Sequence, residues 1–179
     1  MSKKNSMNVG ILGGSFDPGH RGHLIISKSV IKTAKLHKLY WVITKQNPFK
    51  NKTFFTLDER IFKLKKMIKN TKKIKILYIE KNIKSNRSID TVKYILRKKR
   101  PKNLFFIIGS DILFEIHKWK SWKKIVKLTK LIVFSRKGYD RRSKKTIVTK
   151  YLENKITFIK NKPINVSSTL LRKRIKKIF

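Results

Sequence analysis

The sequence predicts a single α/β domain in which helices cover both faces of a parallel sheet. Six short apolar runs alternate with six longer stretches whose apolar residues recur at helical spacing, and this alternation is typical of parallel strands joined by helical crossovers. No linker, repeat or low-complexity segment divides the 179 residues, a length that suits one domain with its own core. We therefore expect a Rossmann-like domain over residues 1–179, with right-handed crossovers between strands.

The apolar runs and the amphipathic stretches give the predicted elements. The predicted strands span residues 9–12, 39–44, 74–79, 104–109, 131–135 and 156–159. The first of the intervening stretches has a helix-like apolar face of leucine, isoleucine and valine. The predicted helices span residues 22–36, 56–69, 88–99, 121–128, 144–152 and 167–178. Residues 1–6 are polar and basic, and we expect them to form a flexible extension before the first strand.

The composition excludes several classes of protein. The chain has no cysteine, which excludes disulfide frameworks, thiolate metal sites and a catalytic thiol. No apolar run approaches the ~20 residues needed to cross a bilayer, and the run after residue 6 is too short and too broken by glycine for a signal peptide. We expect a cytoplasmic protein without a membrane partner. The oligomeric state stays open, with a homo-oligomer among the alternatives.

The net charge is strongly positive. Lysine and arginine number 48 against nine acidic residues, which gives a formal charge of +39. Such an excess is typical of nucleic-acid binders, but here it runs through almost every predicted element, and lysine, isoleucine, asparagine and phenylalanine are residues of A/T-rich codons. Mutational drift is therefore favoured over selected nucleic-acid binding. Under either interpretation the charge, screened over roughly 8 Å at physiological salt, should attract polyanions nonspecifically.

A glycine turn with two histidines follows the first predicted strand. Residues 13–23 read G-G-S-F-D-P-G-H-R-G-H. Gly13 and Gly14 allow the backbone to turn and to approach a ligand closely. The N–H groups at the start of the next helix form an anion site, and His20 and His23, three residues apart, can face the same anion. The pattern predicts a phosphate-binding turn.

A second phosphate-binding pattern lies near the other end of the chain. Residues 166–172 read V-S-S-T-L-L-R. The hydroxyls of Ser167, Ser168 and Thr169 can donate to phosphate oxygens at a helix start, and Arg172 adds a planar charged fork from the same face. For Ser167 alone, a simple helix cap is the alternative.

Both patterns resemble signatures of the nucleotidylyltransferase superfamily. The first is similar to G-[GT]-[FS]-F-D-P-x-H-x-G-H and the second to I-S-S-T-x-x-R. Members of this superfamily transfer a nucleoside monophosphate from a triphosphate to a phosphate acceptor. The resemblance implies that the triphosphate binds at both patterns and that His20, His23 and Arg172 are the catalytic residues.

Between these patterns, from about residue 7 to residue 178, the chain resembles the nicotinate-nucleotide adenylyltransferases. Arg60 is similar to the arginine that opens that family's second helix. Five further segments match family motifs in order: N-P-F-K at 47–50, S-I-D-T at 88–91, I-I-G-S-D at 107–111, K-W-K-S-W at 118–122 and S-R-K-G at 135–138. The resemblance implies transfer of AMP from ATP to nicotinate mononucleotide, which gives deamido-NAD and pyrophosphate.

The resemblance also implies the binding residues. Those implied for ATP are Gly13, Gly14, Ser15, Phe16, His20, His23, Gly109, Asp111, Ser167, Ser168, Thr169 and Arg172. Those implied for the acceptor are Lys50, Arg87, Ser88, Thr91, Trp119 and Arg136. Mg²⁺ is the implied cofactor, held mainly by the phosphates of ATP rather than by metal-binding side chains.

Several of these residues have structural alternatives. Asp111 can cap a helix, Trp119 can be ordinary core packing, Ser88 and Thr91 can be helix-capping groups, and Lys50 is one lysine among many. The chain also departs from the family pattern. Arginine replaces tyrosine at position 87, and positions 47, 49 and 137 hold asparagine, phenylalanine and lysine in place of proline, histidine and proline.

These departures concern the acceptor side, so other acceptors stay open as alternatives. Within the superfamily these are nicotinamide mononucleotide and phosphopantetheine. From a different class, the chain could be a basic nucleic-acid-binding protein with a vestigial site.

Overall fold

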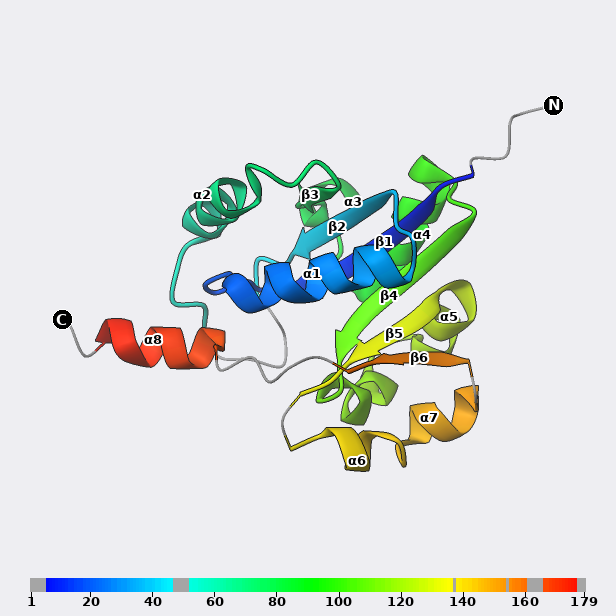
Figure 1. The fold of residues 1–179 in the computed structure, drawn as a ribbon. Helices are drawn as coiled ribbons and strands as arrows, with labels where there is room; N and C mark the ends of the chain where they lie inside the picture. The colour runs from blue at the N-terminus through cyan, green and yellow to red at the C-terminus, as the bar shows by residue number, and fades with distance from the viewer. Residues whose placement is uncertain (1–5, 47–51, 137, 154, 161–165, 177–179) are drawn as a thin grey trace.

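The strands form one parallel sheet, as the sequence predicts. The computed structural model describes residues 6–46, 52–136, 138–153, 155–160 and 166–176. The sheet has six strands in the order β3-β2-β1-β4-β5-β6, and every neighbouring pair runs parallel (Figure 1). The strands are β1 (Asn8–Gly14), β2 (Lys38–Ile43), β3 (Ile74–Leu77), β4 (Asn103–Gly109), β5 (Lys130–Phe134) and β6 (Ile156–Ile159).

All six predicted helices are present, most of them with shorter bounds. They are α1 (Arg21–Thr33), α2 (Leu57–Ile68), α4 (Ser88–Lys99), α5 (Trp122–Leu128), α7 (Ile147–Leu152) and α8 (Ser168–Lys176). Helix α7 begins three residues later than predicted because the Thr146 side chain caps it, accepting a hydrogen bond from the Thr149 N–H group.

Four short helical segments were not predicted. They are α3 (Glu80–Ile83), the 3₁₀ segments η1 (Ile112–Phe114) and η2 (Ile116–Lys118), and α6 (Asp140–Ser143). The predicted strand 74–79 ends at Leu77 because Ile79 already caps α3. Segments of three or four residues are too short for a periodic pattern to identify them.

Two apolar layers cover the two faces of the sheet. One layer packs α4, α5 and α7 against alternate strand residues such as Ile11, Phe106 and Val133. The other packs α1 and α2 against the intervening residues, including Ile107 and Trp41. This alternation follows from the two-residue period of a strand. In the described part of the chain, no helix is long and apolar enough to cross a membrane.

Parallel strands give the sheet two chemically different edges. All six strands end at the carboxyl edge, where β1 leads into α1, β2 leads toward α2, and β4 leads into η1 (Figure 1). Helices α1, α2, α4, α5 and α7 each lead back to the opposite, amino edge, where the next strand begins. Ligands of open α/β sheets bind beyond the carboxyl ends of strands, where the strand order reverses. Here the order reverses between β1 and β4.

Candidate active site

The turn after β1 begins later than the sequence suggested. Gly13 and Gly14 still belong to β1 and pair with Val42 and Ile43 of β2, so they do not make the turn. Phe16 makes it instead, with a left-handed φ of 47°. Nothing lies within 4 Å of a Cβ built on Gly13, which leaves open space beside the strand end.

The two motif histidines form the N-terminal cap of α1. His20 is the cap residue, and its Nδ1 accepts a hydrogen bond from the Gly22 N–H group at 3.1 Å. His23 Nδ1 accepts from the His20 N–H group at 3.2 Å, and the ring centroids are 4.0 Å apart. Because both Nδ1 atoms accept, a neutral ring of either residue carries its proton on Nε2. Each imidazole is thus oriented as an Nε2–H donor.

The electrostatic environment keeps His20 neutral. Burial, and secondarily the positive charge of Arg136, lowers the pKa of His20 from 6.5 to about 4. At pH 7 the ring is therefore a hydrogen-bond donor without a positive charge.

An aromatic stack supports the second histidine. The Phe16 side chain is only 2% exposed and stacks on Trp41 with centroids 5.3 Å apart. The Phe16 and His23 rings lie 4.8 Å apart. The Phe16 side chain belongs to the core beneath His23, and the contact of this residue with ATP that the resemblance implies stays a prediction.

Helix α8 docks on the same turn from the far end of the chain. The Ser168 hydroxyl donates to the Pro18 carbonyl oxygen at 2.9 Å. Arg172 Nη2 donates to the Thr169 hydroxyl at 3.2 Å, so these two residues share a helix face as predicted. The Ser167 hydroxyl accepts from the Leu170 N–H group, which is the simple helix cap. The two predicted phosphate-binding patterns therefore lie side by side.

Asp17 connects this turn to the segment before α2. Its carboxylate is 4% exposed and accepts hydrogen bonds from the N–H groups of Phe54 and Phe55, at 2.7 and 2.9 Å. Arg172 Nη1 lies 3.6 Å from the same carboxylate. Buried charges are stable only when paired and hydrogen-bonded, and Asp17 meets both conditions.

Arg60 fixes the base of the site, a role that the sequence did not reveal. The residue is 1% exposed, and it donates to carbonyl oxygens of three segments. The accepting residues are Ser15 after β1, Thr44 and Lys45 after β2, and Phe55 and Thr56 before α2. Burial lowers the pKa of Arg60, and the charges of Asp17 and Glu80 partly oppose that change. The sequence signal that could have revealed this role of Arg60 is an arginine on the core-facing side of an amphipathic helix.

Glu80 holds the end of β2 from the other side. Its carboxylate accepts hydrogen bonds from the Thr44 hydroxyl and from the Lys45 N–H group. Arg60 and Glu80 together fix Thr44 and Lys45 through both their carbonyl and their donor groups.

A second polar group lies at the ends of β4 and β5. Asp111 pairs with Arg136, with Oδ2 and Nη1 3.2 Å apart, while Asp111 Oδ1 is buried without a hydrogen-bond partner. A Cβ on Gly109 would lie 2.3 Å from that Oδ1, so only glycine leaves room for the carboxylate there. The Arg136 N–H group donates to the Ser110 hydroxyl at 2.9 Å. Arg136, which is predicted to bind the acceptor, thus pairs with Asp111, which is predicted to bind ATP.

The remaining predicted acceptor residues are spread along the carboxyl edge. Arg87 is exposed and precedes α4, and Ser88 is the first residue of that helix without acting as its side-chain cap. Thr91 is buried. Trp119 packs edge-on against Phe106, and its Nε1 is buried without a hydrogen-bond partner. Lys50, like positions 47, 49 and 137, lies outside the described residues.

The arrangement suits the binding of phosphorylated ligands. Two imidazole donors, a helix N-terminus and a guanidinium group surround the turn after β1. A buried carboxylate oxygen without a partner lies across the strand-order reversal, at the end of β4. Such an oxygen can accept from ribose hydroxyls or contact a cation.

The chain is similar to known proteins over most of its length. Residues 11–174 match a family model described as cytidylyltransferase-like. A Pelagibacter ubique protein named "probable nicotinate-nucleotide adenylyltransferase" is 44% identical over 92% of each chain. An Aquifex aeolicus protein of the same name is 33% identical, over 89% of this chain and 98% of its own.

Solved structures share the fold. A Plasmodium falciparum nicotinic acid mononucleotide adenylyltransferase, complexed with NaAD, superimposes with a TM-score of 0.75. The match covers 93% of this chain and 83% of that chain, at 22% sequence identity.

Proposed function

The chain belongs to the cytidylyltransferase-like family and, within it, to the nicotinate-nucleotide adenylyltransferases, and we propose on this basis that it adenylylates nicotinate mononucleotide. It transfers AMP from ATP and forms deamido-NAD and pyrophosphate, a step of NAD biosynthesis. Such an enzyme fits the cytoplasmic location expected from the sequence.

One observation carries the catalytic assignment: the capping histidines of α1 and the start of α8 meet at a single turn. His20 and His23 present Nε2–H donors, and Arg172 is held within hydrogen-bond reach of the same turn. These groups come from opposite ends of the chain, so only the fold brings them together.

The reaction needs positioning more than acid–base chemistry. An oxygen of the nicotinate mononucleotide phosphate attacks the α-phosphorus of ATP, and the bond from that phosphorus to the bridging oxygen breaks to release pyrophosphate. The attacking phosphate monoester has a second pKa near ~6 and is largely dianionic at pH 7, so it needs no general base. The enzyme must bring two polyanions together and stabilise negative charge in the transition state.

The described residues can fulfil these tasks. His20 and His23 donate to phosphate oxygens, and the positive ends of the α1 and α8 helix dipoles attract the same anion. Arg172 supplies positive charge while Asp17 fixes its orientation. Asp111 Oδ1 accepts from a ribose hydroxyl or contacts the metal-bound nucleotide, which would satisfy its buried oxygen.

Mg²⁺ fits this donor set as a cofactor held mostly by ATP. Among the described residues, no three side chains of His, Cys, Asp or Glu gather into a metal-binding group. Mg²⁺ commonly binds through one or two carboxylates together with substrate phosphates, and the unpartnered oxygen of Asp111 can supply such a contact. When bound, the ion neutralises charge on the phosphates.

The test is pyrophosphate release from Mg-ATP with three separate acceptors: nicotinate mononucleotide, nicotinamide mononucleotide and phosphopantetheine. Moderate salt suppresses nonspecific binding of anions to this basic chain. We expect turnover to prefer the nicotinate substrate. Preference for another acceptor would overturn the acceptor assignment, and no turnover by folded protein would overturn the proposed activity.

A further inference from the structure

The acidic residues gather at one edge of the sheet. All nine acidic residues lie within the described part of the chain, and eight of them belong to segments at the carboxyl edge. They are Asp17, Asp58, Glu59, Glu80, Asp90, Asp111, Glu115 and Asp140. Glu153 alone lies at the amino edge, between α7 and β6. Basic residues lie at both edges, as the sequence suggested, but at the amino edge hardly any acidic residue offsets them.

Cations line the amino edge across the sheet. A lysine stands at or next to the first residue of five strands. In strand order these are Lys73 for β3, Lys38 for β2, Lys102 for β4, Lys130 for β5 and Lys155 for β6. Neighbouring strands lie about 4.8 Å apart, so the row extends for about 24 Å. The helix ends behind it add the exposed residues Lys32, Lys35, Lys69, Lys72, Arg97, Lys98, Arg100 and Lys127.

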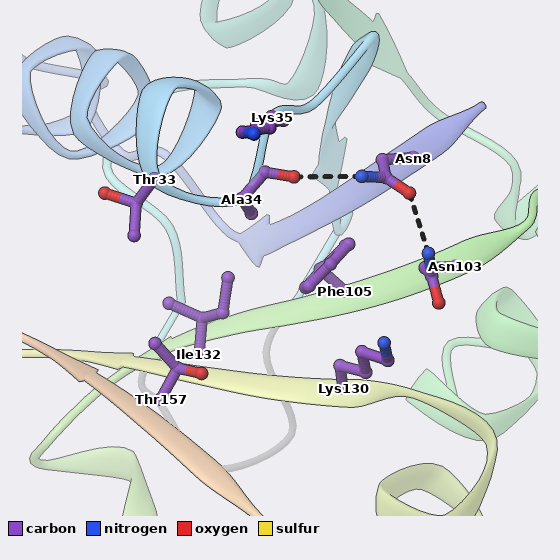
Figure 2. Close-up of a pocket in the computed structure, with 9 residues that line it drawn as sticks. All are labelled: Asn8, Thr33, Ala34, Lys35, Asn103, Phe105, Lys130, Ile132 and Thr157. Atoms are coloured by element: carbon purple, nitrogen blue, oxygen red, sulfur yellow. Dashed lines mark hydrogen bonds between the residues drawn. The ribbon is translucent and has the colours of Figure 1, made fainter. Parts of the chain in front are cut away.

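One lysine of the row, Lys130, lines a hollow with polar and aromatic walls. A pocket of about 280 Å³ opens between Lys35 and Lys130, beside the ends of α1 and the starts of β1 and β4 (Figure 2). Asn103 donates to the Asn8 side chain at 2.8 Å, and Asn8 donates to the Ala34 carbonyl oxygen at 3.1 Å. Phe105 forms a half-buried aromatic wall.

We propose that the amino edge binds single-stranded RNA, with the lysine row contacting successive phosphates and the hollow taking a base or ribose. A cationic track combined with an aromatic surface is the usual design of single-strand binding sites. This function is separate from the proposed transferase activity, because the edge lies at the opposite end of the strands from the start of α1, where the proposed active site lies (Figure 1).

The same features disfavour a lipid surface. Membrane-surface binding combines basic residues with exposed large apolar side chains that insert between lipids. Of the ten exposed large apolar side chains given for the described residues, only Leu128 and Tyr151 belong to helix ends at this edge. A concave hollow with amide walls suits a flexible strand better than a flat bilayer.

The experiment measures the affinity of the full-length protein for a labelled single-stranded oligouridine across a salt series. The test variant combines Lys35→Ala, Lys72→Ala, Lys102→Ala and Lys130→Ala. Its matched control combines Lys81→Ala, Lys93→Ala, Lys144→Ala and Lys145→Ala, exposed lysines nearer the carboxyl edge that remove the same net charge. Neither set includes a residue of the proposed active site.

We expect the test variant to lose about 10²-fold in affinity near physiological salt, and the slope of log K against log salt to flatten by about 3, since each lost phosphate contact removes roughly 0.7. In the control variant the slope should flatten by less than one-third of that amount. Equal losses in both variants would show that the charge acts diffusely and would overturn the proposed location. Pyrophosphate release should be unchanged in the test variant.

Three competitors and one further variant identify the ligand class. Inorganic polyphosphate and anionic phospholipid vesicles offer charge without bases, and duplex DNA offers phosphates with stacked, inaccessible bases. Phe105→Leu keeps the net charge, and we expect it to weaken oligouridine binding several-fold while leaving polyphosphate binding unchanged. Binding of vesicles, duplex or polyphosphate in preference to oligouridine would overturn the assignment to single-stranded RNA.

Discussion

Asp17 and Arg172 form an ion pair across 155 residues of sequence, with Nη1 of the arginine 3.6 Å from Oδ2 of the aspartate. The same Nη1 donates to the Asp17 backbone carbonyl oxygen. The pair attaches the last helix to the turn that carries the capping histidines. It therefore links the stability of the fold to the geometry of the proposed active site.

Breaking this pair should reduce both stability and turnover. Asp17→Asn keeps the side-chain shape but removes the negative charge opposite Arg172 and weakens the contacts with the Phe54 and Phe55 N–H groups. We expect the free energy of unfolding to fall by about 1–3 kcal/mol, measured by urea denaturation. A double-mutant cycle with Arg172→Met, which removes the positive charge, isolates the pair. If the two changes are strictly additive, the pair makes no contribution of its own.

The capping histidines should be needed for turnover. His20→Asn and His23→Asn each keep a side chain capable of accepting a backbone N–H bond, so α1 should remain capped. Each loses the Nε2–H donor, and we expect pyrophosphate release to fall on the order of 10²-fold. Circular dichroism checks that the fold is intact. Turnover at the wild-type rate in both variants would contradict the site assignment.

Protonation of His20 should make stability depend on pH. Its pKa is about 4 in the folded protein, against 6.5 for an unperturbed histidine. Between pH 4 and pH 6.5 the His20 side chain binds its proton more strongly in the unfolded chain than in the folded protein. The contribution of His20 to the free energy of unfolding is therefore complete above pH 6.5 and declines as the pH falls toward 4. The slope should not exceed about 1.4 kcal/mol per pH unit. His20→Asn should flatten the profile of unfolding free energy over this range; an unchanged profile would assign the dependence to other groups.

Replacing Arg60 should loosen the base of the site. Arg60→Met leaves the carbonyl oxygens of Ser15, Thr44 and Lys45 without their buried donor, and we expect a loss of about 3 kcal/mol in unfolding free energy. Arg60→Lys keeps the charge but not the planar fork, so it should recover only part of this loss. If Arg60 positions the turn, Arg60→Lys should also lower kcat under conditions where the protein is fully folded. Normal kcat in that variant would restrict Arg60 to stability.

Gly109 should be required for the position of Asp111. In Gly109→Ala the new methyl group would lie 2.3 Å from Asp111 Oδ1 and 3.1 Å from Arg136 Nε, so the carboxylate must move. We expect KM for ATP or for the acceptor to rise about tenfold. Asp111→Asn is the matched control, because it removes the charge without adding bulk. Unchanged KM values in both variants would exclude Asp111 from substrate binding.

Most of the fold could be predicted from local sequence patterns. Alternating apolar runs identified all six strands, and helical periodicity identified six helices, because these signals depend only on residues close in sequence. The four short helical segments escaped because they contain less than one full period of the pattern. The turn was placed at Gly13 and Gly14, whereas the pairing of β1 with β2 carries the strand through both residues and leaves the turn to Phe16.

The sequence by itself determined the order of elements, both phosphate-binding patterns and the family resemblance, since each is written in neighbouring residues. Only the tertiary structure decided that Asp17 pairs with Arg172, that Arg60 joins three segments, and that Asp111 keeps a buried oxygen without a partner. It also gathered most acidic residues at one edge of the sheet. The physical reason is the sheet topology: parallel pairing brings all strand ends to one edge, the strand order makes β1 and β4 neighbours there, and no local pattern encodes which ends become neighbours.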